Sequence, residues 1–302
     1  TLTNHLKRLK VRSVFSPFYR SYNMKSYHYQ LVNVFAESHW GGNPLAVFTE
    51  ADGLSDGEMQ LIARQMNLSE CAFVMKETNE SAVKRLRIFT PEYEMPFAGH
   101  PTIGTAFVLH NLLNLEDNYV LQTQAGLVEL NHQNDVITFS LPIGSVQDAP
   151  LNKTEAAEIL GLKPSDIASQ PSWVNTGADQ LLVELSSLEA VKTCKISTAL
   201  FFHKALSQTG IAQMYIWHAQ HNSAQVRLFF GLNGAVAEDP GTGSAAANLG
   251  SWCAHHGRAP LNWLIRQGDE IGRPNRLTLK VDNKIHIGGK VIKVGEGKIL
   301  VP

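Results

Sequence analysis

The feature that most constrains the fold is a weak internal repeat. Residues 87–109 resemble residues 227–249 when the chain is shifted by 140 positions (227 minus 87) without a gap. The identical pairs include Arg87 and Arg227, Phe89 and Phe229, Thr102 and Thr242, Ala106 and Ala246, and Leu109 and Leu249. Each copy is typical of an apolar strand, a loop with Gly and Pro, and an Ala-rich helix. The repeat predicts duplicated halves about a pseudo-twofold axis, with one cleft between two helix N-termini.

Such a cleft is suited to a small acid. The first N–H groups of a helix have no partner within the helix and lie at the positive end of its dipole, so they stabilise a carboxylate or phosphate. Gly99, Gly241 and Gly243 fall at the two turns, where glycine lets the backbone approach a ligand closely. The neighbouring polar residues expected to contact the ligand are His100, Asp239, Thr242 and Ser244.

The composition narrows the function classes. With 302 residues and 44% apolar content, the chain can form two domains with full cores. The formal net charge of -1 comes without a basic stripe, which argues against a nucleic-acid partner. No apolar run reaches the roughly 20 residues that cross a bilayer. The three cysteines show no CxxC spacing, which favours reduced thiols in a cytoplasmic protein.

Residues 1–23 differ in charge from the rest of the chain. They contain five basic residues and no acidic one, and Met24 stands just before the first clear strand. An Arg-rich, acid-free segment is typical of a mitochondrial presequence, whereas the position of Met24 favours an upstream or appended segment. Residues 1–23 are therefore expected to be a leader or appended segment without a role in the chemistry.

Glu70 and His100 are the candidate acid–base groups. Glu70 stands directly before an apolar strand at 71–75, where desolvation raises the pKa of a carboxyl toward the range useful for proton transfer. Its alternative role is structural, as a loop cap or a partner of a lysine. His100 lies directly before the helix expected at 101–113, where the dipole disfavours imidazolium, so a neutral hydrogen-bonding group is predicted. A purely structural histidine remains the alternative there.

Many short strands with one central helix in each half predict an α+β fold. Capping boxes at Ser55 to Glu58 and Asn152 to Glu155 predict the starts of two further helices. The halves are expected at 24–141 and 151–289, joined by a linker at 142–150. Each is predicted to be a curled, mostly antiparallel, barrel-like sheet around its helix.

Three rival motifs fail on context. Residues 241–246 match the dinucleotide pattern GxGxxA, but no hydrophobic strand leads into them and no acidic residue follows about 20 positions later. Ser244, His100 and Asp239 resemble a hydrolase triad, yet there is no GxSxG elbow. The grouping of Cys253, His255 and His256 matches no zinc spacing. Neither a cofactor nor a metal is therefore expected.

Three ordered motifs resemble the PhzF family of phenazine-biosynthesis-like isomerases, a branch of the diaminopimelate epimerase fold. They are Asn-Leu-Ser-Glu at 67–70, Phe-Ala-Gly-His-Pro-Thr-Ile-Gly-Thr-Ala at 97–106 and Glu-Asp-Pro-Gly-Thr-Gly-Ser-Ala at 238–245. The resemblance runs from about Met24 to Pro302. It implies a cofactor-free homodimer with the active site between two similar halves, and a chain end at 290–302 that returns to the first half. It also implies Glu70 as the acid/base, with His100, Asp239 and Ser244 contacting the substrate.

One departure from the related epimerases bears on the chemistry. Those enzymes carry a cysteine at each helix start, whereas neither 99–100 nor 239–243 contains one here. Two-thiol racemisation is therefore excluded, and an isomerase that shifts a C–H proton of a small carboxylic acid through one carboxylate is predicted. The alternatives are an amino-acid epimerase with Glu70 and Asp239 as opposed bases, and a non-catalytic protein that binds small acids.

Overall fold

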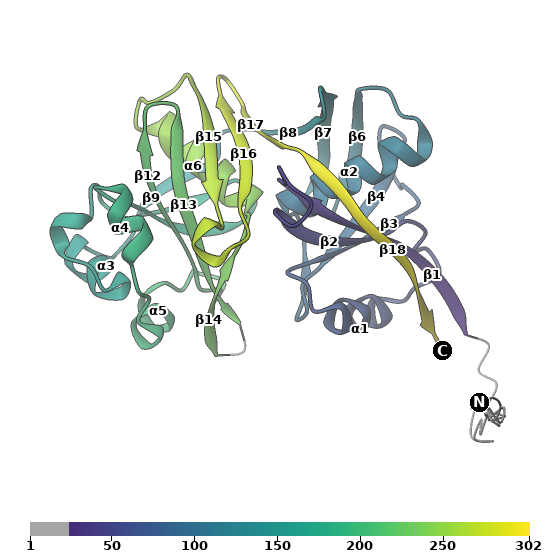
Figure 1. The fold of residues 1–302 in the computed structure, drawn as a ribbon, viewed down its shortest axis with the longest axis horizontal. Helices are drawn as coiled ribbons and strands as arrows, with labels where there is room; N and C mark the ends of the chain where they lie inside the picture. Colours follow the sequence, from purple (N-terminus) through teal and green to yellow (C-terminus); the bar gives the residue numbers. More distant parts are fainter. Residues whose placement is uncertain (1–23, 233) are drawn as a thin grey trace, which may run out of the picture.

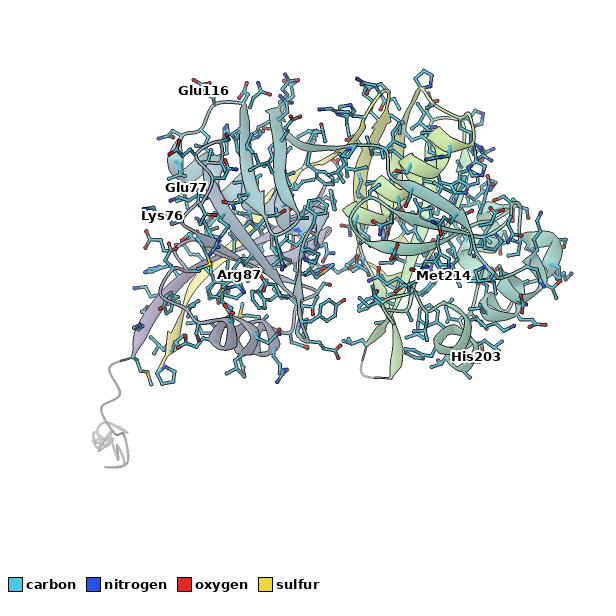
Figure 2. The ribbon with its side chains drawn as sticks, turned by 180° about the vertical axis from the view of Figure 1, so that it is seen from behind. Lys76, Glu77, Arg87, Glu116, His203 and Met214 are labelled. Atoms are coloured by element: carbon cyan, nitrogen blue, oxygen red, sulfur yellow. The ribbon has the colours of Figure 1, made fainter. Side chains whose placement is uncertain are left out.

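The computed structural model describes residues 24–232 and 234–302, so the expected leader at 1–23 lies outside the described residues. Two lobes lie side by side (Figure 1, and from behind in Figure 2), and in each a curled sheet surrounds one central helix. The strands of both lobes are joined in one continuous, mostly antiparallel network of pairings. The predicted α+β class and the curled sheets around central helices are confirmed.

The first lobe contains the central helix α2 and the outer helix α1. Its elements are β1 (Lys25–Val34), β2 (Asn43–Phe48), α1 (Asp56–Met66), β3 (Cys71–Met75), β4 (Lys84–Phe89), β5 (Glu94–Met95), α2 (Gly99–Leu113), β6 (Asn118–Thr123), β7 (Gly126–Gln133) and β8 (Val136–Leu141). The last strand of the chain, β18 (Val291–Val301), pairs antiparallel with β1. The carboxyl end of the chain therefore lies beside the first strand (Figure 1).

The second lobe contains the central helix α6 and three outer helices. Its elements are β9 (Ser145–Asp148), α3 (Lys153–Leu160), the short helix η1 (Pro164–Asp166), β10 (Ser172–Asn175), β11 (Asp179–Glu184), α4 (Leu188–Thr193), α5 (Thr198–Lys204), β12 (Gln213–Gln220), β13 (Ser223–Leu232), β14 (Ala235–Asp239), α6 (Gly243–His255), β15 (Leu261–Gln267), η2 (Asp269–Ile271), β16 (Asn275–Val281) and β17 (Ile285–Gly289).

The connection between the lobes is itself structured. Strand β9 falls within the stretch expected as a linker at 142–150, and it pairs with β10. Strand β17 pairs with β16 on one side and with β8 on the other, which joins the two sheets. The predicted boundaries of the halves remain a prediction, because sheet pairing crosses between them. None of the described helices combines the length and the apolar character needed to span a membrane.

The central helices are buried because their residues are small or apolar. Ten of the fifteen residues of α2 and eleven of the thirteen of α6 are buried. One apolar cluster encloses both helices and draws residues from both lobes. The two helix starts touch, since a Cβ atom added to Gly99 would lie 2.9 Å from Cα of Gly243. Glycine is required at this contact because any side chain would separate the helices.

The outer helices pack on the convex faces of the sheets. Helix α1 covers a second apolar cluster that contains Phe48 and Phe73, and helices α3 to α5 cover a third around Phe201. The predicted capping boxes are present at the starts of α1 and α3, where Ser55 and Asn152 accept hydrogen bonds from Glu58 N–H and Glu155 N–H. Their first amides are thereby satisfied within the protein.

The internal repeat is real, but its ungapped frame fails before the helices. Arg87 pairs with Glu94 and stacks over Phe89, and Arg227 pairs with Glu238 and stacks over Phe229 in the same way. However, Phe89 pairs with Glu94, five positions on, whereas Phe229 pairs with Glu238, nine positions on. The second hairpin is therefore four residues longer (nine minus five). The helices begin 144 positions apart, so Gly99 corresponds to Gly243 and Met95 to Asp239.

Candidate active site

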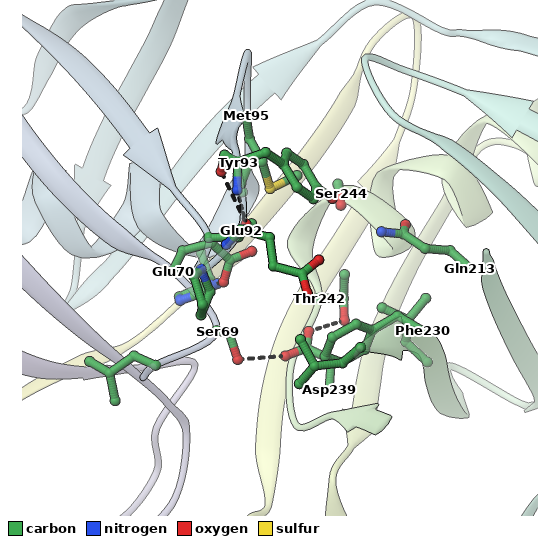
Figure 3. A pocket seen from close by; sticks show the side chains of 18 of the residues that line it. Ser69, Glu70, Glu92, Tyr93, Met95, Gln213, Phe230, Asp239, Thr242 and Ser244 are labelled. Carbon is green, nitrogen blue, oxygen red and sulfur yellow. Dashed lines mark hydrogen bonds and ion pairs between the residues drawn. The ribbon is translucent and has the colours of Figure 1, made fainter. Parts of the chain in front are cut away.

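A cavity of about 250 Å³ lies between the lobes at the starts of α2 and α6 (Figure 3). Seven of the eight predicted site residues line it: Glu70, Gly99, His100, Asp239, Thr242, Gly243 and Ser244. The exception is Gly241, which does not line the cavity. It is packed against Asn275, whose Oδ1 would clash with an added Cβ, and its carbonyl accepts a hydrogen bond from Asn43. Gly241 therefore shapes the turn rather than the cavity wall.

Glu70 reaches the cavity from the loop between α1 and β3. Helix α1 ends at Asn67 in the left-handed conformation, and β3 begins at Cys71 with a side chain that faces the core. Because side chains alternate along a strand, this register directs Glu70 away from that core and toward the cavity. The Glu70 side chain retains 16% of its exposed surface, but its Oε2 atom is buried without a hydrogen-bond partner among the described residues.

Asp239 ends β14 and is surrounded by hydrogen-bond donors. The Asn43 amide donates to its Oδ1 atom over 3.0 Å, and the Ser69 hydroxyl donates to the same oxygen over 3.4 Å. The Thr242 hydroxyl donates to Oδ2. Gln267 holds Thr242 in place, since its Oε1 accepts from the Thr242 N–H and its Nε2 donates to the hydroxyl. Three donors stabilise a negative charge on Asp239.

The two carboxyls differ in protonation. Burial raises the pKa of Asp239 to about 6, although the hydrogen bonds from Thr242, Asn43 and Ser69 oppose the rise. Burial raises the pKa of Glu70 well above its usual value, and the negative charge of Asp239 raises it further. Because the two groups lie in the same cavity, the first negative charge of the pair is held at the carboxyl with more hydrogen-bond donors, which is Asp239. At neutral pH we therefore assign the charge to Asp239 and a proton to Glu70.

His100 is neutral in this setting. Burial lowers the pKa of His100 to about 3, so burial rather than the helix dipole is the main cause. Its Nδ1 atom lies 3.5 Å from Oε2 of Glu70. Because His100 is neutral and Glu70 is protonated, this is a contact between two uncharged groups rather than an ion pair. It places the imidazole beside the carboxyl that carries a proton.

The two central helices begin without side-chain caps. The residues at their N-caps, Ala98 and Thr242, make no capping hydrogen bond, in contrast to the caps of α1 and α3. Ala98 has no polar side chain, and the hydroxyl of Thr242 is directed to Asp239. The positive ends of both helices therefore face the cavity and remain free for an anion. The residues described, 24–232 and 234–302, contain no cluster of three or more His, Cys, Asp or Glu side chains that would hold a metal ion.

Several wall residues were not predicted from the sequence. The turn between β4 and β5 contributes Glu92 and Tyr93, and the end of β13, in the longer β13–β14 hairpin, contributes Phe230 and Leu232. Two further wall residues, Gln180 and Gln213, lie at the starts of β11 and β12. One feature of the sequence could have indicated polar partners such as Gln180. Asn248 is a polar residue inside an Ala-rich buried helix, and a buried amide requires hydrogen-bond partners from other elements.

Comparison with known proteins is consistent with this architecture. Residues 32–297 match the family model described as phenazine biosynthesis-like protein, PhzC-PhzF. The chain belongs to the PhzF family. Membership confirms the resemblance of the three motifs and the expectation of an isomerase.

Relatives and solved structures agree with this assignment. An uncharacterized isomerase of Pasteurella multocida is 60% identical over 279 residues, covering 91% of this chain and 95% of the relative. The trans-2,3-dihydro-3-hydroxyanthranilate isomerase of Pseudomonas fluorescens is 33% identical, covering 91% of this chain and all of the relative. The crystal structure of a Bacillus anthracis PhzF-family protein superposes with a TM-score of 0.80 at 26% identity, covering 92% of this chain and all of that one.

Proposed function

We propose that this PhzF-family protein is a cofactor-independent isomerase that moves a C–H proton within a small, cyclic or amino-bearing carboxylic acid. The observation that carries the proposal is a cavity between two uncapped helix starts that contains two unlike carboxyls. Oε2 of Glu70 is buried without a hydrogen-bond partner among the described residues, whereas Asp239 accepts three hydrogen bonds. Glu70 is the single acid/base. The Gly99 and Gly241 to Ser244 turns bind the carboxylate, and His100, Asp239 and Ser244 position the rest of the ligand.

The proton shift needs a group that is an acid first and a base second. Protonated Glu70 gives its proton to one carbon of an unsaturated substrate, and the resulting carboxylate takes a proton from another carbon on the same face. Atoms and charge balance, because Glu70 ends as it began and the substrate is isomerised. Asp239 stabilises the positive charge that the substrate carries between the two steps.

Burial of the cavity supports this chemistry. Enclosure between the lobes removes water from the carboxyl, which keeps the pKa of Glu70 high and strengthens the hydrogen bonds to the ligand. All three cysteines are buried and unpaired, and none of them lines the cavity. Burial raises the pKa of Cys71 to about 12, so this neighbour of Glu70 is not a thiolate at neutral pH.

The test is proton NMR in D₂O with a panel of cyclic and amino carboxylic acids that includes trans-2,3-dihydro-3-hydroxyanthranilate. Isomer formation, or deuterium uptake, is expected with the wild type and not with Glu70→Gln, which keeps the shape of the side chain but has no carboxyl to give and take a proton. The matched control is Glu92→Gln, because Glu92 is an exposed carboxyl at the same cavity. The control should retain turnover. Turnover by Glu70→Gln would remove Glu70 as the acid/base.

The epimerase alternative requires Asp239 to act as a second base. Its two oxygens already accept hydrogen bonds from Asn43, Ser69 and Thr242, which leaves a poor base for a C–H proton. Chiral chromatography that detects inversion at Cα distinguishes an epimerase from the proposed isomerase, because proton transfer on one face cannot invert a centre. A non-catalytic binding protein would instead bind the carboxylates tightly and change none of their C–H bonds.

A further inference from the structure

A chain of hydrogen-bonded amides runs from the core of the second lobe to the cavity wall. Asn248 of α6 contacts Gln180 of β11, and Gln180 contacts both Gln213 of β12 and Ser244 at the start of α6. Asn248 is fully buried and Gln180 retains only 2% of its exposed surface. A buried amide can donate only through nitrogen and accept only through oxygen, so each contact restricts the next.

Backbone carbonyls fix the orientation of Asn248. Its Nδ2 atom lies 2.9 Å from the carbonyl oxygens of both Val174 and Ala178, and these oxygens can only accept. The Oδ1 atom accepts from the Thr176 hydroxyl over 2.8 Å. The Nδ2 atom of Asn248 also lies 2.8 Å from Oε1 of Gln180, so its two hydrogens are shared among three oxygens. The oxygen of Gln180 faces it because two NH₂ groups at that distance would repel one another.

The orientation of Gln180 follows from that of Asn248. Since its oxygen faces Asn248, its Nε2 atom faces the cavity side and donates to Oε1 of Gln213 over 3.1 Å and to Oγ of Ser244 over 3.2 Å. An amide nitrogen carries two hydrogens, so both donors of Gln180 are used. Gln213 and Ser244 are thus each held as acceptors on their buried side.

Their remaining groups are donors, and they face the cavity. With its oxygen engaged, Gln213 directs its NH₂ group forward, and Ser244 keeps its hydroxyl hydrogen for another acceptor. Within the described part of the chain no acceptor contacts either donor, and both residues line the cavity opposite Glu70 (Figure 3). Two oriented donors beside the start of α6 form a site for an oxygen acceptor.

The charge of the wall makes neutral donors necessary. Among the described residues lining the cavity there are three carboxyl side chains, Glu70, Glu92 and Asp239, and no lysine or arginine. A carboxylate bound here has no cationic side chain in the wall to pair with. Its oxygens must be satisfied by helix-start amides and by neutral side-chain donors.

We propose that Gln213 is a substrate-binding residue that donates to an oxygen of the bound acid, and that Gln180 is a positioning residue that holds Gln213 and Ser244 as donors. This inference rests on the proposed function, because it assigns the carboxylate to the second lobe and leaves the carbon skeleton beside Glu70. It selects acids whose carboxylate is offset from the carbon that exchanges its proton.

The test uses the full chain and two stable probes, anthranilate and aniline, which differ by the carboxylate. Calorimetric titration should show a preference of the wild type for anthranilate. Gln213→Met, similar in length but without a donor, should lose about tenfold or more of the anthranilate affinity and none of the aniline affinity. The matched control is Gln220→Met, on the same strand but exposed, which should bind as the wild type does.

The two proposals fail in different ways. If the wild type shows no preference for anthranilate, there is no carboxylate site and the proposed function fails together with this inference. If the wild type prefers anthranilate and Gln213→Met binds it within twofold of the wild type, the carboxylate site stands and the role of Gln213 is overturned.

The role of Gln180 is tested by introducing Gln180→Met into two backgrounds, the wild type and a variant that lacks both donors. Gln180→Met alone should weaken anthranilate binding at least as much as Gln213→Met, since both donors lose their orientation. In a chain that already carries Gln213→Met and Ser244→Ala, adding Gln180→Met should change the affinity by less than twofold. A purely structural role for Gln180 would weaken binding equally in both backgrounds, and thermal unfolding of each variant identifies any that fail to fold.

Discussion

Two carboxyls in the same cavity behave differently because their neighbours differ. Asp239 accepts from Asn43, Ser69 and Thr242, whereas Oε2 of Glu70 has no partner among the described residues. The negative charge is therefore held at Asp239, and it disfavours a second charge nearby. The pKa of Glu70 is raised by burial and by Asp239 together. In the proposed mechanism, this asymmetry makes Glu70 the proton donor before any ligand arrives.

The raised pKa of Glu70 predicts a pH-dependent stability difference. A carboxyl whose pKa is higher in the folded than in the unfolded state binds more protons when the protein is folded. The free energy of unfolding therefore falls as pH rises from the pKa of the unfolded state, about 4.5, through the pKa of the folded state. Glu70→Gln lacks this group, so the Tm of the variant minus that of the wild type should grow between pH 4 and pH 8. Differential scanning calorimetry measures it, with Glu92→Gln as control. A constant difference would contradict burial of Glu70 as an ionisable group.

Asp239→Asn should change the pH profile of turnover. The wild type is expected to lose kcat below about pH 6, where Asp239 becomes protonated. In the variant this acid limb should disappear. The alkaline limb should move to lower pH, because removing the charge of Asp239 lowers the pKa of Glu70. Steady-state assays across pH 4 to 10 measure both limbs, and an alkaline limb that stays in place would show that the two carboxyls are not coupled.

At the scale of elements, the outer helices α1 and α3 differ at their starts from the central helices α2 and α6. The outer helices α1 and α3 satisfy their first amides with capping boxes, while the central helices α2 and α6 leave theirs toward the cavity. The contact of Gly99 with Gly243 holds the two free ends side by side. An anion placed between them is stabilised by both dipoles at once. The starts of α2 and α6 therefore determine where an anion can bind.

Substituting either of these glycines should separate the helix starts. In Gly99→Ala the new Cβ would lie 2.9 Å from Cα of Gly243, and backbone cannot move aside as a flexible side chain can. We expect a loss of about 1–3 kcal/mol in the free energy of unfolding and weaker carboxylate binding. Gly57→Ala is the control, since nothing lies within 4 Å of its added Cβ and it lies in helix α1, where alanine adds roughly 0.5–1 kcal/mol. Denaturant unfolding compares the two variants, and equal effects would contradict the contact.

The sequence predicted the helices and strands better than it predicted how they pair and how long the hairpins between them are. Capping residues and apolar patterns act locally, so the starts of α1 and α3 and the strand after Glu70 were readable from the chain. The four additional residues of the second hairpin were not readable, because strand pairing rather than residue identity determines where a hairpin closes. Gln180 and Gln213 were missed for a related reason. Their meeting depends on the parallel pairing of β11 with β12, which no local pattern encodes.

On the scale of the whole molecule, the two lobes share one core. The apolar cluster around α2 continues into that around α6, and sheet pairing between β8 and β17 crosses the boundary. Strand β18 then returns to β1 in the first lobe. Separating the lobes would expose apolar surface from both, which makes independent unfolding unfavourable.

A single unfolding transition is therefore expected. Four of the five tryptophans, Trp173, Trp217, Trp252 and Trp263, lie in the second lobe, so tryptophan fluorescence reports mainly on that lobe. Far-UV circular dichroism reports on both lobes. The two signals should give the same midpoint in guanidinium chloride. Separate midpoints would mean that the lobes unfold one at a time.

The longer hairpin of the second lobe places Asp239 where the first lobe has Met95, and the helix starts set His100 against Ser244. A cleft with true twofold symmetry would accept a ligand in two orientations of equal energy, related by half a turn. Here one orientation brings the carbon skeleton to Glu70. The reversed one brings it to Gln213, which precedes Met214 as Glu70 precedes Cys71 and whose amide cannot serve as a base. The duplication thus supplies a matched pair of anion sites, and the unequal hairpins remove the degeneracy. For the proposed proton shift, we therefore expect a product of single regiochemistry.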